Sequence, residues 1–307
     1  MNVHDWALIT FTVLTQMSVG TVWALGIAHY FAVRKYGMEE ADRLSDRALL
    51  AVIPVVVLAF LASLLHLGDP LSAPRAVTNL GSSWLSREIF TGVLFAGLTV
   101  VFAFLQWRKI GSFGMRNVIA WLAALVGLAL VWSEAMVYYS LPSQPAWNSL
   151  ATPVTFFVTT FLLGALAVGA AFVANYASLK GKADVKEEAQ RTLLGECLRW
   201  IAIVAVVLLG VELVVLPLYL GSLAVGTQAG LESVQMMIGP FGSALALRLI
   251  LAFVGAGVFA VFLYQNARSV GQEKVLGNLA YAAFVMVLAA EVLGRFMFYA
   301  AHVRIGI

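Results

Sequence analysis

The sequence predicts an all-α integral membrane protein built as a bundle of eight transmembrane helices. Of its 307 residues, 62% are hydrophobic and only 11% are charged, whereas a soluble globular protein has about 25% charged residues. Eight apolar runs are long enough to cross the hydrocarbon core as helices, which takes about 20 residues. They lie at roughly 6–33, 48–66, 88–106, 117–140, 153–178, 198–220, 241–266 and 275–300. The runs lack the alternation of barrel strands, and backbone groups in lipid must be hydrogen-bonded within the segment, so the runs are expected to be helical.

The connections between the spans are short. No loop is longer than roughly 22 residues, so the sequence predicts a single transmembrane domain over residues 1–307. Met1 to Asp5 carry no basic residue, and the first run is too long for a signal peptide and lacks a small-residue cleavage site, so no removable signal is expected. The charged stretch from Lys182 to Glu188 is expected to form a solvated helical extension next to the sixth span.

Basic residues are distributed unequally between the two faces of the predicted bundle. Of the 19 Lys and Arg residues, 14 lie in the loops after the first, third, fifth and seventh spans, three lie on the opposite face, and two lie inside spans. Because Lys and Arg favour cytoplasmic loops, this bias predicts that both termini lie on the outer, periplasmic side.

The sequence offers few groups that could hold a redox centre. Cys197 is the only cysteine, whereas an iron–sulfur cluster held by this protein alone would need about four thiolates. A bis-histidine haem site needs two histidines at one depth, but His29 lies on the opposite face from His66 and His302, and those two sit at span ends. We therefore expect no haem, no iron–sulfur cluster and no bound metal on this protein.

Seven ionisable residues gather in the outer half of the predicted bundle. Even-numbered spans run outward and odd-numbered spans run inward, and a helix rises about 1.5 Å per residue, so each depth follows from sequence position. The seven residues are His66, Glu88, Glu134, Glu212, Arg248, Glu291 and Arg295. Ionisable groups within spans are costly, so they are expected to serve a function or to be paired.

Two interpretations apply to these residues. Glu291 and Arg295 are four residues apart on one helix face, and Glu212 could pair with Arg248 on a neighbouring helix, so these four are compatible with structural ion pairs. His66 and Glu88 flank one polar external loop and have no obvious partners. An imidazole that titrates near neutral pH beside a carboxylate is suited to proton transfer.

Two motifs carry a resemblance to a known family. The loop after the second span reads His66-Leu67-Gly68-Asp69-Pro70-Leu71, followed by Asn79-Leu80 and by Trp84-Leu85-Ser86-Arg87-Glu88-Ile89. The last span reads Glu291-Val292-Leu293-Gly294-Arg295-Phe296-Met297-Phe298-Tyr299. The sequence resembles the membrane anchor subunit of the dimethyl sulfoxide reductase family over nearly its whole length. The resemblance rests on these motifs, the length, the eight spans and the external termini.

The resemblance implies a role in anaerobic respiration. In this family the anchor sits in the bacterial inner membrane, binds menaquinol as a transient substrate and holds two partners on its outer face. The partners are a molybdopterin catalytic subunit and an iron–sulfur electron-transfer subunit; no nucleic-acid partner is implied. The family's quinol-site histidine and glutamate match His66 and Glu88, and its anchor carries no haem. The protein would oxidise quinol only as part of the complex, and Arg87 receives no transferred role.

Two alternatives remain open at this point. The protein could be the anchor of a polysulfide-type or another related reductase, because the terminal acceptor is chosen by the catalytic subunit. A protein of a different class, a secondary transporter, would be expected to have broken helices and a polar site at mid-membrane. Here Pro54 is the clearest mid-span proline, and the polar residues lie off-centre.

The predicted orientation can be tested with reporters fused after Ile307. Because the basic loops are expected to stay in the cytoplasm, a periplasmic reporter such as alkaline phosphatase should be active and a cytoplasmic one inactive. A fusion in the loop at Lys109 is the internal control and should give the reverse pattern. Cytoplasmic activity at Ile307 would overturn the depth of every residue assigned above.

Overall fold

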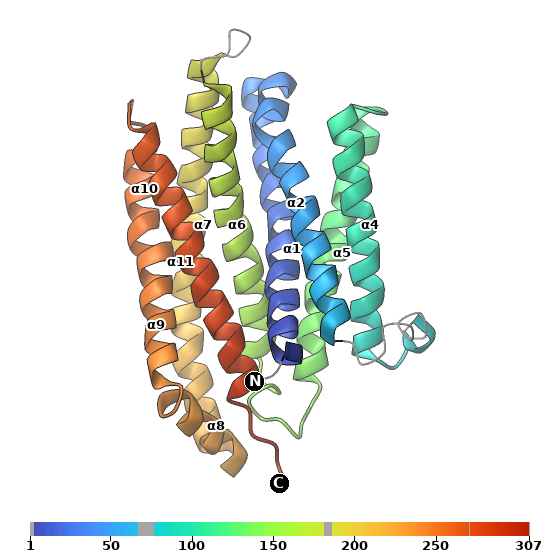
Figure 1. Cartoon of the computed structure of the whole chain (residues 1–307), viewed down its shortest axis with the longest axis vertical. Helices are drawn as coiled ribbons and strands as arrows, with labels where there is room; N and C mark the ends of the chain where they lie inside the picture. Colours follow the sequence, from blue (N-terminus) through green and yellow to red (C-terminus); the bar gives the residue numbers. More distant parts are fainter. Residues whose placement is uncertain (1–2, 67–76, 181–185, 270, 307) are drawn as a thin grey trace.

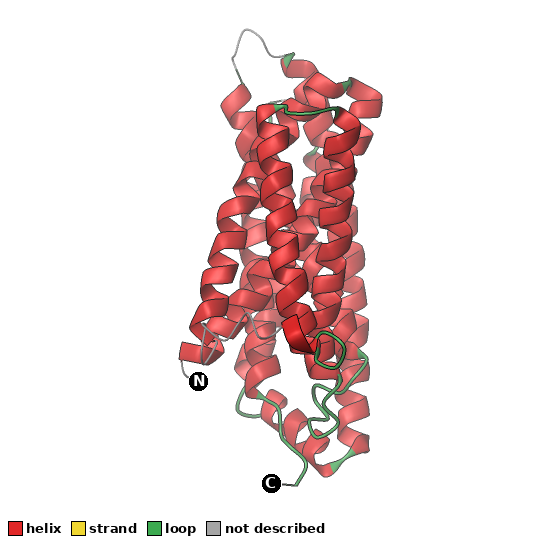
Figure 2. Cartoon of the chain, turned by 90° about the vertical axis from the view of Figure 1, so that its right-hand side faces the viewer, coloured by secondary structure: helices red, strands yellow, loops and turns green. Residues whose placement is uncertain are grey.

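The computed structural model describes residues 3–66, 77–180, 186–269 and 271–306, and these residues contain helices and no strand (Figure 2). Eight of the helical segments are long and apolar enough to cross a membrane. The predicted fold class, an all-α membrane bundle, is therefore confirmed for the described residues.

The long helices follow the predicted spans closely. Their bounds are α1 (Val3–Tyr36), α2 (Met38–His66), α4 (Trp84–Arg108), α5 (Phe113–Tyr139), α6 (Ala151–Leu179), α7 (Glu187–Gly226) and α11 (Glu273–Ala300). The seventh span is built from three consecutive pieces, α9 (Gly242–Ala252), the π-helical segment η3 (Phe253–Phe259) and α10 (Ala260–Asn266). A short 3₁₀ segment, η2 (Val77–Asn79), precedes α4.

One feature departs from the simple span pattern, and one predicted feature is confirmed in part. The connection after the sixth span contains a helix, α8 (Gln228–Ile238), whose first turn is capped by the Thr227 side chain accepting a hydrogen bond from the Gly230 amide at 3.0 Å. This helix is too short and too polar for a search based on long apolar runs to detect. The extension before the sixth span is confirmed from Glu187, where α7 begins, whereas residues 181–185 lie outside the described residues.

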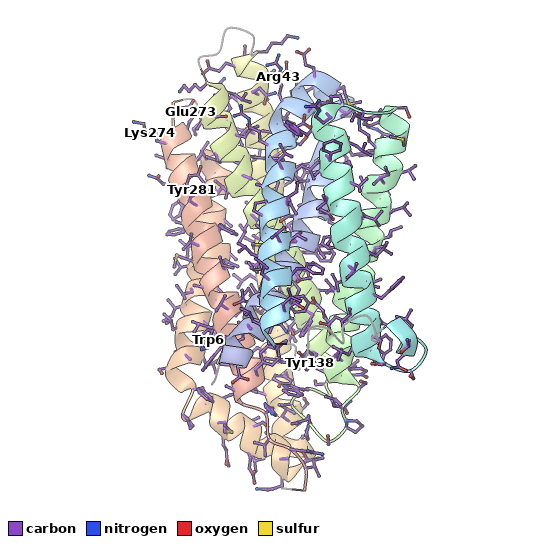
Figure 3. The ribbon with its side chains drawn as sticks, turned by 45° about the vertical axis from the view of Figure 1, so that its right-hand side comes forward. Trp6, Arg43, Tyr138, Glu273, Lys274 and Tyr281 are labelled. Atoms are coloured by element: carbon purple, nitrogen blue, oxygen red, sulfur yellow. The ribbon has the colours of Figure 1, made fainter. Side chains whose placement is uncertain are left out.

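The helices are arranged around two central members. α1 and α6 are the most buried spans, and Figure 1 shows them in the middle of the bundle. α1 packs against α2, the hairpin of α4 and α5 lies on one side, and α7, α9, α10 and α11 lie on the other. Both termini and α8 lie at the same end of the bundle, which we call the terminal end (Figure 1). The opposite end, where Figure 3 shows Arg43 and Lys274, is called the basic end.

The two central helices cross at a pair of glycines. A Cβ atom on Gly20 of α1 would overlap the carbonyl oxygen of Thr160, and one on Gly164 of α6 would overlap the backbone of Gly20. Close backbone approach at small residues is the usual way that membrane helices gain packing energy, because lipid supplies no hydrophobic driving force between helices. This crossing therefore fixes the distance between the two central helices, against which α2, α5, α7 and α11 pack.

We expect Gly164→Val to destabilise the bundle by about 3 kcal/mol or more, because the side chain must separate α1 from α6. The matched control is Gly210→Val on α7, where an added Cβ meets no atom within 4 Å. Thermal unfolding of the purified protein and its yield in membranes are the measurements. Equal stability of the two variants would show that the crossing is not a constraint.

Candidate functional site

The start of α4 presents Glu88 to the interior of the bundle. Ser83 caps the helix, and its side chain accepts a hydrogen bond from the Ser86 amide at 3.3 Å. Arg87 donates to the carbonyl oxygens of Leu80 and Gly81, both at 2.8 Å, and its guanidinium lies 4.1 Å from the centre of the Trp84 ring. These contacts hold the preceding turn against the helix, so Arg87 has a structural role, while its neighbour Glu88 is buried with 7% of its surface exposed.

His66 ends α2 at the terminal end of the bundle. Its side chain and the loop residues 67–76 lie outside the described residues, so the position of the imidazole stays a prediction. Both predicted site residues lie at the terminal end of the α2–α4 pair. A Cβ on Gly92 of α4 would lie 3.6 Å from the tip of the Phe60 ring of α2. His66 is six residues beyond Phe60, and Glu88 is four residues beyond Gly92, toward the terminal end.

Glu88 lies within electrostatic range of a second buried carboxylate. It interacts electrostatically with Glu134 of α5, which is fully buried, and with the phenol groups of Tyr138 and Tyr299. The structure thus brings together Glu88 and Glu134, which come from the two helices of one hairpin.

Gln16 of α1 lies at the centre of this site. Its amide nitrogen donates to Glu134 Oε2 at 3.1 Å, and its amide oxygen accepts from the Arg295 guanidinium at 2.8 Å. The Arg295 guanidinium also lies 3.7 Å from the centre of the Phe156 ring, so it is shielded on one face by an aromatic side chain. The second oxygen of Glu134, Oε1, has no hydrogen-bond partner within the described residues.

A tyrosine pair extends the polar network toward the terminal end. The Tyr299 hydroxyl donates to the Tyr138 hydroxyl at 3.0 Å and lies 3.2 Å from the Thr12 hydroxyl. Trp147 packs edge-on against Tyr138, with ring centres 5.2 Å apart, and donates its indole N–H to the carbonyl oxygen of Phe298 at 2.7 Å. Figure 3 shows Tyr138 at this end of the bundle. The hydroxyls thus form a hydrogen-bonded line beside the two carboxylates.

A second polar cluster lies between α6, α7, α9 and α11. Arg248 forms an ion pair with Glu212, as the sequence suggested. Glu291 accepts a hydrogen bond from Thr159 at 2.6 Å and interacts electrostatically with Glu212. The cluster lines a cavity of about 80 Å³, which is room for a few water molecules.

The expected pairing of Glu291 with Arg295 is wrong. Although the two residues are four apart on α11, Arg295 donates to Gln16, and Glu291 is turned toward Thr159 and Glu212. The neighbouring Gly294 explains part of this arrangement, because a Cβ there would lie 2.6 Å from Arg248 Nε. The glycine lets the Arg248 side chain lie against the α11 backbone.

Sequence reasoning missed the uncharged members of the site. Gln16, Thr12, Tyr138, Thr159 and Tyr299 are all buried and belong to the two polar clusters, yet none is ionised at neutral pH. A glutamine inside a span was the signal that could have identified Gln16, because an amide in lipid also needs partners.

Other candidate ligands have partners of their own. His29 lies at the basic end with its Nε2 2.9 Å from Asp42 Oδ1, and His302 lies with its Nδ1 2.8 Å from the Tyr299 carbonyl oxygen. In the described part of the protein, no three or more His, Cys, Asp or Glu side chains are grouped as a metal site.

Comparison with known proteins gives the family. The model of the DMSO reductase anchor subunit family (DmsC) matches residues 1–301. The chain belongs to this family. It is therefore a multi-pass membrane protein and the anchor subunit of a DMSO reductase-type complex, and the secondary-transporter alternative is wrong.

Relatives of the protein include subunits of more than one complex. It is 27% identical to a component of the anaerobic dimethyl sulfoxide reductase of Escherichia coli (strain K12), over 99% of its own length and 96% of the relative. It is 24% identical to the component of the same name from Haemophilus influenzae, over 99% of its own length and 97% of the relative. It is also 27% identical to a component of the sulfite dehydrogenase of Allochromatium vinosum, over 57% of its own length and 56% of the relative.

We expect Arg248→Met to destabilise the protein by about 3–5 kcal/mol, because it leaves the Glu212 carboxylate buried without its cation. The double variant Arg248→Met, Glu212→Leu should recover most of this loss, since apolar residues of similar volume replace a buried ion pair at little cost. Thermal unfolding of the purified proteins measures both effects. If the single variant is as stable as the native protein, the ion pair is not structural.

Proposed function

We propose that the protein oxidises menaquinol at the terminal end of the bundle and passes the electrons to an iron–sulfur subunit. In this proposal the terminal end faces the periplasm, the protein resides in the bacterial inner membrane, and the complex serves anaerobic respiration. The iron–sulfur subunit and a molybdopterin catalytic subunit bind at the outer face. The anchor does not turn over substrate alone.

The observation that carries the proposal is the burial of Glu88 near Glu134, with Arg295 as the cation joined to Glu134 through Gln16. Two buried carboxylates beside one guanidinium leave an excess negative charge in a low-dielectric site, which is costly unless a proton neutralises it. Such a pair is suited to accept and release protons.

Oxidation of one quinol to a quinone releases two electrons and two protons. We assign His66 to accept or to hydrogen-bond one hydroxyl, because it ends α2 at the same end of the bundle as Glu88. Glu88 takes the second proton or orients the imidazole of His66. A general base must lie within hydrogen-bond reach of the proton that it accepts, and the hydroxyl line of Tyr138, Tyr299 and Thr12 offers further positions toward the terminal end.

The electrons must leave the anchor directly. Because Cys197 is the only cysteine and we expect no redox group on this protein, an iron–sulfur centre of the partner is expected close to the terminal end. The positive-inside rule supports the placement of that end outside, because the described basic loops lie at the other end. The apolar faces of the surrounding helices suit an isoprenoid tail.

The terminal acceptor of the complex is not encoded in these residues. One relative is named as a component of a sulfite dehydrogenase. The second candidate function is therefore that of an anchor in a related complex, such as a polysulfide-type reductase. Purification of the complex and identification of its catalytic subunit distinguish these cases.

We expect His66→Ala and Glu88→Gln each to lower quinol-driven turnover of the complex by about 10²–10⁴-fold, the usual effect of losing a general base. Reduction driven by an artificial dye should be unchanged, because the dye feeds the soluble partners directly. The control is Glu39→Gln at the basic end, a largely exposed glutamate that pairs with Arg43. Normal quinol-driven turnover in both site variants, at equal partner content, would refute the assignment of the site.

A further inference from the structure

A second and larger cavity lies at the basic end, away from the proposed quinol site. Its volume is about 550 Å³, and residues of α1, α2, α4 and α5 line it. The walls are mainly aromatic and aliphatic, and they include Trp23, Phe102, Phe113 and Trp121. Nothing in the proposed quinol chemistry uses this space.

The cavity arises because two helical hairpins meet at mid-depth and leave space beyond. At Gly127 of α5, an added Cβ would lie 2.9 Å from Val19 of α1 and 3.1 Å from Phe95 of α4, so the hairpins are in close contact there. One turn further, Trp23 donates to the Ala124 carbonyl oxygen at 2.9 Å and forms the floor of the cavity. The cavity extends from this floor toward the basic end between α1 and α5, where Arg34 and Arg116 line it.

The shallow end of the cavity is cationic. Arg116 of α5 lines it with only 8% of its surface exposed, donates to the Gly111 carbonyl oxygen at 3.2 Å, and leaves its Nε without a hydrogen-bond partner among the described residues. Arg34 of α1 also lines the cavity, with its guanidinium 4.4 Å from the centre of the Tyr30 ring. A buried guanidinium N–H without a partner is costly, so an acceptor is expected at this position.

The nearby carboxylates are already engaged. Lys109 contacts both Asp42 and Asp46 at 2.7 Å, and Gln106 donates to the same two side chains at 2.9 Å. His29 is the third partner of Asp42. These contacts hold the acidic groups behind the cavity wall, and within the described residues no Asp or Glu side chain lines the cavity itself.

The cavity is also open toward lipid. Ile27, Phe31 and Trp121 line it and are each at least half exposed. Arg116 and Ala124 are eight residues apart on α5, so the cationic end and the apolar floor are separated by about 12 Å along the membrane normal. A phosphate at the interface with an acyl tail directed into the hydrocarbon has the same layout.

We propose that this cavity binds an anionic phospholipid from the leaflet at the basic end. The headgroup phosphate lies between Arg116 and Arg34, and one acyl tail lies between Trp23, Phe102 and Trp121. Basic pockets between transmembrane helices on the cytoplasmic side are suited to anionic headgroups, which are enriched in that leaflet. The site is independent of the quinol chemistry proposed above.

A second quinone fits the same space less well. A quinone ring is uncharged and does not need two guanidinium groups. Its ring would lie near His29, 13 residues along α1 from Gln16, or about 20 Å, and the described residues between them hold no metal-ligating cluster to relay electrons.

The test uses the purified complex after removal of lipid with detergent. Phosphatidylglycerol should raise the midpoint of thermal unfolding by several degrees, whereas phosphatidylcholine with the same acyl tails and inorganic phosphate should not. In Arg116→Gln we expect about tenfold more phosphatidylglycerol to be needed for half of the shift, as for loss of one charged hydrogen bond. Arg108→Gln is the matched control, because Arg108 is exposed at the same end and does not line the cavity.

A second variant tests the volume rather than the charge. Gly26 lines the cavity, and a Cβ there meets no atom within 4 Å, so Gly26→Leu should narrow the space without a clash at its Cβ. It should reduce the phosphatidylglycerol shift and leave quinol-driven turnover intact. The proposal is overturned if both lipids raise the unfolding midpoint of the native complex equally, or if Gly26→Leu retains the full shift. It is also overturned if Arg116→Gln and Arg108→Gln need the same concentration of phosphatidylglycerol, or if a neutral naphthoquinone displaces the bound phosphatidylglycerol.

Discussion

The polar centre of this bundle depends on one side-chain amide. Gln16 donates to a carboxylate with its nitrogen and accepts from a guanidinium with its oxygen, so it connects Glu134 of α5 with Arg295 of α11. An ionised carboxylate can only accept and an ammonium group can only donate, whereas an amide satisfies both partners without adding charge. Because Gln16 is on α1, which is held against α6 at Gly20 and Gly164, the close packing of the central helices also fixes the geometry of the site.

Much of the architecture could be predicted because lipid imposes simple requirements. A span must be apolar and about 20 residues long, so the eight spans and the common end of both termini follow from the positions of apolar runs. The pairing of Glu212 with Arg248 could also be predicted from the sequence, because opposite charges at equal depth on neighbouring helices attract each other. The short helix α8 was not predicted, because it is too short and too polar to be recognised as a span. The π-helical segment η3 was not predicted, because it lies within the apolar run of the seventh span and is as apolar as that run.

The detailed arrangement of the site was harder to predict from the sequence, for a physical reason. Spacing along a helix tells which residues share a face, but the rotation of that helix in the bundle decides what the face meets. Glu291 and Arg295 share a face of α11, yet one meets Thr159 of α6 and the other Gln16 of α1. Glu88 was identified from its motif, but its proximity to Glu134 could be found only from the packing of α4 on α5.

The contact at Gly127 has a consequence for energy conservation. It closes the space between the two hairpins at mid-depth with Val19 and Phe95, both almost completely buried. On one side lie the buried carboxylates, and on the other lies the wide cavity with its histidine and arginines. If the two compartments were joined by water, protons could cross the membrane and dissipate its electrochemical gradient. The glycine lets two apolar side chains fill this gap, and such a layer opposes the passage of water and protons between the two compartments.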